Sequence, residues 1–248
     1  MALTDVIPSD RPLRVAVLTG AGISAESGVN TFRGQDGLWN GHRIEDVATP
    51  EGWIIDSEKV WAFYQERRRQ LKDVEPNSGH LALSELEKRM EAGCFTLITQ
   101  NVDDLHERGG TENLIHMHGE LRLLRCEVCE HKFEAMDSKH LENDEFIPCP
   151  ECGNPKVRPE IVWFGEMPFQ MTELQQAVID CDLFLVIGTS GNVYPAAGLL
   201  GQALSSGSYC VGINLEPPLN VDLFDEFHQG SAGELLPLLV KELTDFLP

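Results

Sequence analysis

Four short runs of apolar and β-branched residues set the strongest limit on how this chain can fold. They are Val15–Thr19, Phe95–Thr99, Leu183–Ile187 and Tyr209–Ile213. None alternates strictly between apolar and polar residues, which is typical of strands buried on both faces. Helix-like stretches lie between them, at residues 76–93 and 195–205. Strands that alternate with helices predict an α/β fold in which helices cover both faces of a parallel sheet.

The charge balance excludes one class of partner. The chain has 19 Lys and Arg residues against 40 Asp and Glu residues, so its formal net charge is −21. Such an acidic protein does not bind phosphate backbones loosely, and we expect no nucleic-acid partner. The acidity fits two other roles equally well, attraction of lysine-rich polypeptides and solubility at high salt.

Neither a membrane span nor an export signal is predicted. No apolar run approaches the roughly 18–20 residues that a span requires. Residues 1–14 contain two prolines and three acidic or basic residues before Pro12, and they lack the apolar core of a signal peptide. We therefore expect a cytoplasmic protein without membrane contact.

Four of the seven cysteines form two pairs with the spacing of metal ligands. Cys126 and Cys129 are followed, after nineteen residues, by Cys149 and Cys152. Four thiolates at this spacing predict one tetrahedral zinc site, and a closed four-sulfur site is structural because it leaves no position for a reacting water. The alternative is four metal-free core cysteines, which the surrounding prolines and charges disfavour.

The first apolar run leads into a glycine-rich turn, Gly20-Ala21-Gly22-Ile23-Ser24. A strand that runs into such a turn and then into a helix is typical of dinucleotide binding, because the backbone can approach a pyrophosphate and the helix N-terminus offers N–H groups. The alternative is an ordinary tight turn. The other three runs also end in polar residues, which favours a cofactor site at this edge of the sheet.

The order of the motifs along the chain makes the pattern specific. Besides the four cysteines, the segments that carry it are Gly20–Ser24, Phe32-Arg33-Gly34, Thr99-Gln-Asn-Val-Asp103, His118-Gly119, Val162-Trp-Phe-Gly-Glu166, Gly188-Thr-Ser190 and Asn214-Leu-Glu216. In this respect the chain resembles the sirtuins, NAD-dependent protein deacylases, and among them the bacterial CobB kind. The resemblance spans about residues 14–239. It departs at Gly28-Val-Asn-Thr-Phe-Arg33, where many sirtuins read Gly-x-Pro-Asp-Phe-Arg.

The resemblance implies the domains, the cofactors and the site. Residues 12–40, 76–120 and 165–248 would form a Rossmann-like NAD-binding domain, and residues 41–75 and 121–164 a small domain made of a helical insertion and the four-cysteine zinc ribbon. The cofactors would be NAD and one structural Zn²⁺. The implied catalytic residues are His118 as general base, with Asn101 and Asp103. His116 is the alternative candidate for the general base. The implied NAD-binding residues are Gly20, Ala21, Gly22, Ser24, Phe32, Arg33, Trp39, Gln100, Asn101, Asp103, Gly188, Thr189, Ser190, Asn214, Leu215, Glu216 and Ala232. The implied substrate-binding residues are Tyr64, Arg67, Val162, Trp163, Phe164 and Gly165.

The helix predicted after Asp56 bears on the acyl group. Helical spacing puts positions 60, 63, 64, 67 and 71 on one face, so Arg67 lies on the apolar stripe while Arg68 and Arg69 point away. Tyr64 and Arg67 could together bind a carboxylate. Alternatively, Arg67 extends to solvent or pairs with an acid such as Glu45 or Asp46.

Sirtuins that remove succinyl and malonyl groups carry such a Tyr-x-x-Arg pair. The resemblance therefore implies a monomeric enzyme that removes acetyl, succinyl and malonyl groups from the lysines of acylated proteins. The implied products are nicotinamide, 2'-O-acyl-ADP-ribose and free lysine.

Two other functions compete with this interpretation. A nicotinamide-dependent dehydrogenase would use the same glycine-rich turn, but it explains neither the cysteines nor the Tyr-x-x-Arg pair. A zinc ribbon that binds nucleic acid or protein would use the cysteines alone, and the acidic residues around them argue against nucleic acid. Release of nicotinamide, formation of NADH or the absence of both would separate the three.

Overall fold

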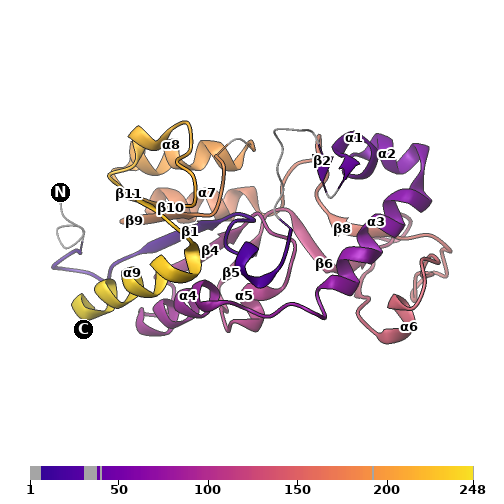
Figure 1. Cartoon of the computed structure of the whole chain (residues 1–248), viewed down its shortest axis with the longest axis horizontal. Coiled ribbons are helices and arrows are strands. Elements are labelled where there is room, and N and C mark those ends of the chain that lie inside the picture. The colour runs from indigo at the N-terminus through magenta and orange to yellow at the C-terminus, as the bar shows by residue number, and fades with distance from the viewer. Residues whose placement is uncertain (1–6, 31–37, 40, 192, 248) are drawn as a thin grey trace.

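The structure is a computed structural model that describes residues 7–30, 38–39, 41–191 and 193–247. It is elongated, with a large parallel sheet and its helices at one end and a smaller lobe at the other (Figure 1). The predicted α/β fold class is thereby confirmed.

The large sheet has six strands, all parallel, in the order β11-β10-β9-β1-β4-β5. Their bounds are β1 Val15–Thr19, β4 Phe95–Thr99, β5 Leu114–His116, β9 Leu183–Ile187, β10 Tyr209–Asn214 and β11 Glu226–Gln229. The four predicted strands are the central ones. The path through the sheet begins at β1 and runs outward through β4 and β5. It then crosses to β9, on the other side of β1. This reversal makes the point between β1 and β9 the topological switch point, where open parallel sheets bind ligands.

Helices cover both faces of the sheet. Alternate residues of each strand point to opposite sides, so each strand contributes to both cores. Val15 and Val17 pack in a core with α4 (Ser78–Arg89) and α9 (Ala232–Phe246). Ala16 and Leu18 pack in a second core with α7 (Met171–Asp180) and α8 (Ala196–Ser206). Figure 1 shows these helix pairs on the two sides of the sheet. None of the helices in the described part is long and apolar enough to cross a bilayer.

The smaller lobe packs a helix against a three-stranded antiparallel sheet, in the order β7-β6-β8. Its strands are β2 Leu38–Trp39, β3 His42–Arg43, β6 Gly119–Arg125, β7 Lys132–Glu134 and β8 Arg158–Ile161. Its helices are α1 Ile44–Val47, α2 Pro50–Ile55, α3 Ser57–Gln70 and α6 Ser138–Leu141; α5 (Leu105–Arg108) follows β4. Asp56 caps α3, its Oδ1 accepting from the N–H of Lys59 at 3.0 Å. An aromatic core that includes Trp61, Tyr64 and Trp163 joins the two layers.

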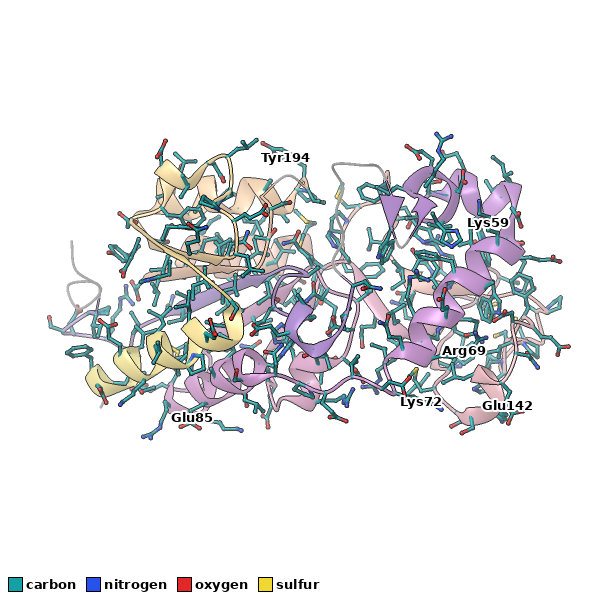
Figure 2. The ribbon with its side chains drawn as sticks, in the orientation of Figure 1. Lys59, Arg69, Lys72, Glu85, Glu142 and Tyr194 are labelled. Carbon is teal, nitrogen blue, oxygen red and sulfur yellow. The ribbon has the colours of Figure 1, made fainter. Side chains whose placement is uncertain are left out.

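Helix α3 is buried on more sides than its apolar stripe predicts. The expectation that Arg68 points away from the core is wrong, because Arg68 is fully buried, donates from Nε to the carbonyl of Leu121 at 2.8 Å and lies over the ring of Trp61. Arg69 is half-buried and donates from Nε to the carbonyl of Leu141 at 2.9 Å. The physical reason is that strand β6 and the segment between the two cysteine pairs both cover the side of α3 that its apolar stripe leaves free. Figure 2 labels Arg69 and Lys72 at the end of α3 beside the segment that carries Glu142.

The glycine-rich turn after β1 packs backbone to backbone against the turn after β9. The N–H of Gly22 donates to the carbonyl of Gly188 at 2.8 Å. A Cβ atom on Gly22 would lie 2.6 Å from the Cα atom of Gly188, and Gly188 itself has φ +62°. Only glycine fits such a contact, so these residues hold the switch point together.

The turn is not followed by the expected α-helix. A three-residue 3₁₀ helix, Ala25–Ser27, ends at Gly28, which has φ +91°. A left-handed glycine is a common helix terminator because it turns the chain away from the helix axis. The described residues therefore do not form the helix N-terminus that the glycine motif predicts for phosphate binding.

We predict that Gly22→Ala lowers the free energy of unfolding by about 1–3 kcal/mol, because the added methyl group overpacks the contact with Gly188. Urea unfolding of the purified variant measures the change. Gly201→Ala is the matched control, since Gly201 is exposed in α8 with nothing near its Cβ position, and there the substitution should be neutral or stabilising. Equal losses in both variants would contradict the assigned role of the contact.

Candidate active site and zinc site

The carboxyl ends of β4, β9 and β10 meet at the switch point. Thr189, after β9, accepts a hydrogen bond on its Oγ1 from Gln100 Nε2 at 3.0 Å and one on its carbonyl from Asn214 Nδ2 at 3.0 Å. The loops after β4, β9 and β10 are thus joined directly. Predicted residues at the rim are more open: Ser190, Leu215 and Glu216 are exposed, while Ala232 is buried at the start of α9.

Three predicted residues form a buried polar group behind this edge. Ser24 Oγ donates to Asp103 Oδ2 at 3.0 Å, and Asn101 Nδ2 donates to Ser24 Oγ at 3.1 Å and to the Gly20 carbonyl at 3.2 Å. Ala21 is the next residue of the same turn. Burial raises the pKa of Asp103 to about 6, although the N–H of Leu105 and the Ser24 hydroxyl oppose it. Asp103 is therefore mostly ionised above pH 7 and bound to neutral donors.

Sequence reasoning missed two histidines beneath this group. His80 Nε2 lies 3.5 Å from Ser24 Oγ, and its ring centroid lies 4.8 Å from that of His106. Burial lowers the pKa of His80 to about 4, so its ring is neutral at pH 7. The available signal was Asn77-x-x-His80, which begins α4 as a capping box.

The pKa values of His118 and His116 are shifted in opposite directions. His118 Nδ1 lies 3.1 Å from the Gln100 carbonyl, which can only accept, so Nδ1 carries the proton and Nε2 holds the lone pair. Burial lowers the pKa of His118. His116 Nε2 lies 2.9 Å from Glu107 Oε1; burial lowers its pKa too, but the Glu107 hydrogen bond and charge outweigh this, so the net pKa is raised. Near pH 7, His118 is therefore the better proton acceptor.

The residues predicted to bind the acyl group lie together on α3. Tyr64 is fully buried, and Arg67 is 5% exposed. The Arg67 guanidinium lies 3.3 Å from the centroid of the Phe63 ring and 5.7 Å from that of Trp39. Trp39 thus packs with the predicted substrate residues, its ring 6.0 Å from Tyr64. Phe32 and Arg33, predicted to bind NAD, lie outside the described residues.

Arg67 is only partly paired. It donates from Nη1 to the carbonyl of Phe63 and lies 3.4 Å from the exposed carboxylate of Glu66. Its Nε is buried without a hydrogen-bond partner among the described residues. The two acids considered as alternative partners lie elsewhere: Glu45 pairs with Arg43, and Asp46 with Lys59. Arg67 therefore retains a buried donor for a further acceptor.

The predicted peptide-binding segment already uses three of its backbone N–H groups. Val162 donates to the His118 carbonyl, Trp163 to Glu166 Oε2 and Phe164 to the Ala48 carbonyl, at 2.8–2.9 Å. Gly165 follows with φ +92°. An added peptide strand would therefore depend mainly on carbonyl oxygens of this segment.

The four cysteines lie at the far end of the smaller lobe. Their Sγ atoms are all within 4.8 Å of one another, and the Cys126–Cys152 and Cys129–Cys149 pairs are 3.6 Å apart. A tetrahedral site with Zn–S bonds of about 2.3 Å requires sulfurs about 3.8 Å apart, so the cluster fits one structural zinc ion.

Both cysteine pairs sit on the same kind of turn. Glu130 follows Cys129 with φ +58°, and Gly153 follows Cys152 with φ +72°. Their N–H groups donate back to the carbonyls of Cys126 and Cys149, at 3.0 and 2.9 Å. Strand β6 separates this site from His118 by seven residues, roughly 23 Å of extended chain. The zinc site is therefore remote from the candidate base.

One other cluster among the described residues has ligand-type side chains, namely Glu107, His116 and Glu120. The short contact between Glu107 and His116 accounts for this cluster as an ion pair.

The comparisons with known proteins agree with this geometry. A model of the Sir2 family matches residues 20–195. A protein of Pasteurella multocida (strain Pm70) named NAD-dependent protein deacylase is 50% identical over 229 residues, which cover 92% of this chain and 96% of that protein. A mutant Sir2 homologue solved with ADP-ribose has a TM-score of 0.88 and 39% identity, covering 98% of this chain and 96% of that one. A Sir2 homologue solved with NAD has a TM-score of 0.84 and 40% identity, covering 96% and 92%.

We predict that Cys126→Ser lowers the zinc content from one ion per chain to nearly none and destabilises the smaller lobe, because a site that loses a thiolate no longer links the two turns. Elemental analysis and thermal unfolding measure the two effects. Cys94→Ser is the control, since Cys94 is outside the cluster. A metal-free variant with unchanged stability would show that zinc does not support this fold.

Proposed function

The chain belongs to the Sir2 family, and from this premise we propose that it is an NAD-dependent protein-lysine deacylase. The observation that carries the proposal is the position of His118, a neutral histidine with a fixed tautomer at the edge of the sheet where three strand ends meet. We propose that the enzyme removes acetyl, succinyl and malonyl groups, and that the products are nicotinamide, 2'-O-acyl-ADP-ribose and free lysine.

The residues at the switch point suit NAD by their chemistry. The amides of Gln100, Asn101 and Asn214 and the hydroxyls of Ser24 and Thr189 offer donors and acceptors for ribose and carboxamide groups. When bound, NAD supplies a ribose carbon that accepts the acyl oxygen as nicotinamide leaves. Asn101 and Asp103 would hold the nicotinamide ribose, and the buried network under them would keep their side chains in place.

His118 would act as the general base on a ribose hydroxyl. Its Nε2 carries the lone pair, and its lowered pKa keeps the ring neutral at pH 7. His116 is less suited to this role because its proton is stabilised by Glu107.

Tyr64 and Arg67 would bind the carboxylate of succinyl and malonyl groups. A buried, incompletely paired guanidinium is costly unless an anion completes its hydrogen bonds, and the aromatic rings beside it exclude water. Acetyl-lysine would fit the same site without using this charge.

We assign residues 12–40, 76–120 and 165–248 to the NAD-binding domain and residues 41–75 and 121–164 to a small domain.

We propose acylated lysine-containing proteins as the partners, because the acidic chain attracts polypeptides in which lysines cluster. None of the cysteines in the described part forms a disulfide, which suits a reducing cytoplasm.

The decisive test is product analysis by liquid chromatography with NAD and a matched pair of acetyl-lysine and succinyl-lysine peptides. We expect deacylated peptide and nicotinamide in equal amounts, and neither product without NAD.

We predict that His118→Ala lowers kcat/KM at least 100-fold while NAD still binds, because only proton removal is lost. Wild-type kcat/KM should fall as the pH is lowered, because the base must be neutral, and the midpoint should lie below the ordinary histidine pKa because burial lowers the pKa of His118. NADH formation instead of nicotinamide release would contradict the proposal.

We predict that Arg67→Met lowers the succinyl-to-acetyl ratio of kcat/KM about 10- to 100-fold, because only the succinyl group loses a charged partner. Competition between the two peptides in one reaction measures the ratio directly. Arg69→Met is the matched control on the same helix, since Arg69 bonds to the zinc-binding segment instead. An equal effect of Arg67→Met on both peptides would contradict the carboxylate assignment.

A further inference from the structure

A buried hydrogen bond joins the peptide-binding segment to the acyl site. Trp163 Nε1 donates to the hydroxyl oxygen of Tyr64 at 3.0 Å, and the two residues are 99 positions apart in the chain. Tyr64 is 0% exposed and Trp163 is 2% exposed. The hydrogen bond between them is therefore shielded from bulk solvent.

This bond fixes which way the Tyr64 hydroxyl points. The indole N–H can only donate, so the tyrosine oxygen must accept and its own proton must point elsewhere. Among the described residues, no acceptor for that proton is found, and burial raises the pKa of Tyr64, so the proton stays in place. The hydroxyl is therefore a donor in need of an acceptor.

A second donor lies one helical turn away. Arg67 follows Tyr64 at i+3 on α3, and its buried Nε also lacks a partner among the described residues. The rings of Trp39 and Phe63 pack beside both side chains. Two donors without acceptors in an apolar setting suit an anionic group with two oxygens.

Trp163 is itself held firmly. The Arg158 guanidinium lies 3.6 Å from the centroid of the Trp163 ring. Arg158 binds both carboxylate oxygens of Glu166, at 2.7 and 2.9 Å, and Glu166 accepts the backbone N–H of Trp163 at 2.8 Å. The indole N–H is thus fixed from its backbone and from its ring face.

We propose that Trp163 is a positioning residue for acyl-group specificity: its indole N–H turns the Tyr64 hydroxyl so that the hydroxyl proton is presented to the carboxylate of an acidic acyl group. This inference rests on the proposed role of Tyr64 and Arg67 as the carboxylate site. A neutral acyl group has no carboxylate to receive the proton, so the direction of the hydroxyl matters for succinyl and malonyl groups alone.

Trp163→Phe tests the role because it keeps an aromatic ring for Arg158 and removes the donor. We expect the succinyl-to-acetyl ratio of kcat/KM to fall about 3- to 10-fold, the effect of one neutral hydrogen bond. The change should appear as a higher KM for the succinyl peptide with little change in kcat, because the carboxylate is bound equally before and during the reaction.

A double-mutant cycle separates positioning from packing. Tyr64→Phe removes the hydroxyl, so adding Trp163→Phe to it should leave the ratio at the Tyr64→Phe value. Trp61→Phe is the matched control: Trp61 is buried in the same lobe and donates to the Glu145 carbonyl, so its loss should lower stability without changing the ratio. Should Trp163→Phe fail to fold, benzothienylalanine at position 163 keeps the shape of the indole without its N–H and is measured in its place.

Three outcomes would overturn the inference. An unchanged ratio in Trp163→Phe, or an equal fall with and without the Tyr64 hydroxyl, would reduce Trp163 to a packing residue while the carboxylate site stands. If instead Tyr64→Phe and Arg67→Met both leave the ratio unchanged, the carboxylate site itself fails, and the inference fails with it. The two failures are thus distinct in the data.

Discussion

The close contact between the turns after β1 and β9 is the constraint on which the rest of the site depends. Gly22 and Gly188 approach so closely that a side chain on either would overlap the backbone of the other turn. This contact brings together two strands that are adjacent in the sheet but about 170 residues apart in the chain. The loop after β4 and the end of β10 then reach the same edge, where the side-chain amides of Gln100 and Asn214 donate to Thr189.

Helix α3 has the corresponding role in the smaller lobe. One side of it carries Tyr64 and Arg67, while Arg68 bonds to β6, which leads to Cys126, and Arg69 bonds to the segment between the two cysteine pairs. The structural metal and the candidate acyl site therefore share one support. Loss of zinc would loosen the helix that presents the carboxylate-binding side chains, even though the metal is remote from His118 and takes no part in the chemistry.

Burial and neighbouring charges set the protonation of the polar residues of the site in three ways. Burial favours the neutral forms of His80 and His118, whereas the Glu107 carboxylate raises the pKa of His116 despite burial. Arg67 is a third case, a buried cation whose charge is only partly balanced within the chain. Each state follows from what the side chain contacts, since all lie in surroundings of low water content.

The sequence by itself determined the elements with strong local signals: the four central strands, the helices after Asp56 and within residues 76–93, and the four-cysteine cluster. Apolar runs, helical spacing and ligand spacing are properties of neighbouring residues, so they can be read along the chain. The edge strands β5 and β11, the fully buried Arg68 and the short 3₁₀ helix after the glycine turn were missed or wrongly expected. Only the tertiary structure decided which histidine is neutral and that Trp163 bonds to Tyr64, because burial and long-range hydrogen bonds depend on segments that are distant in the chain.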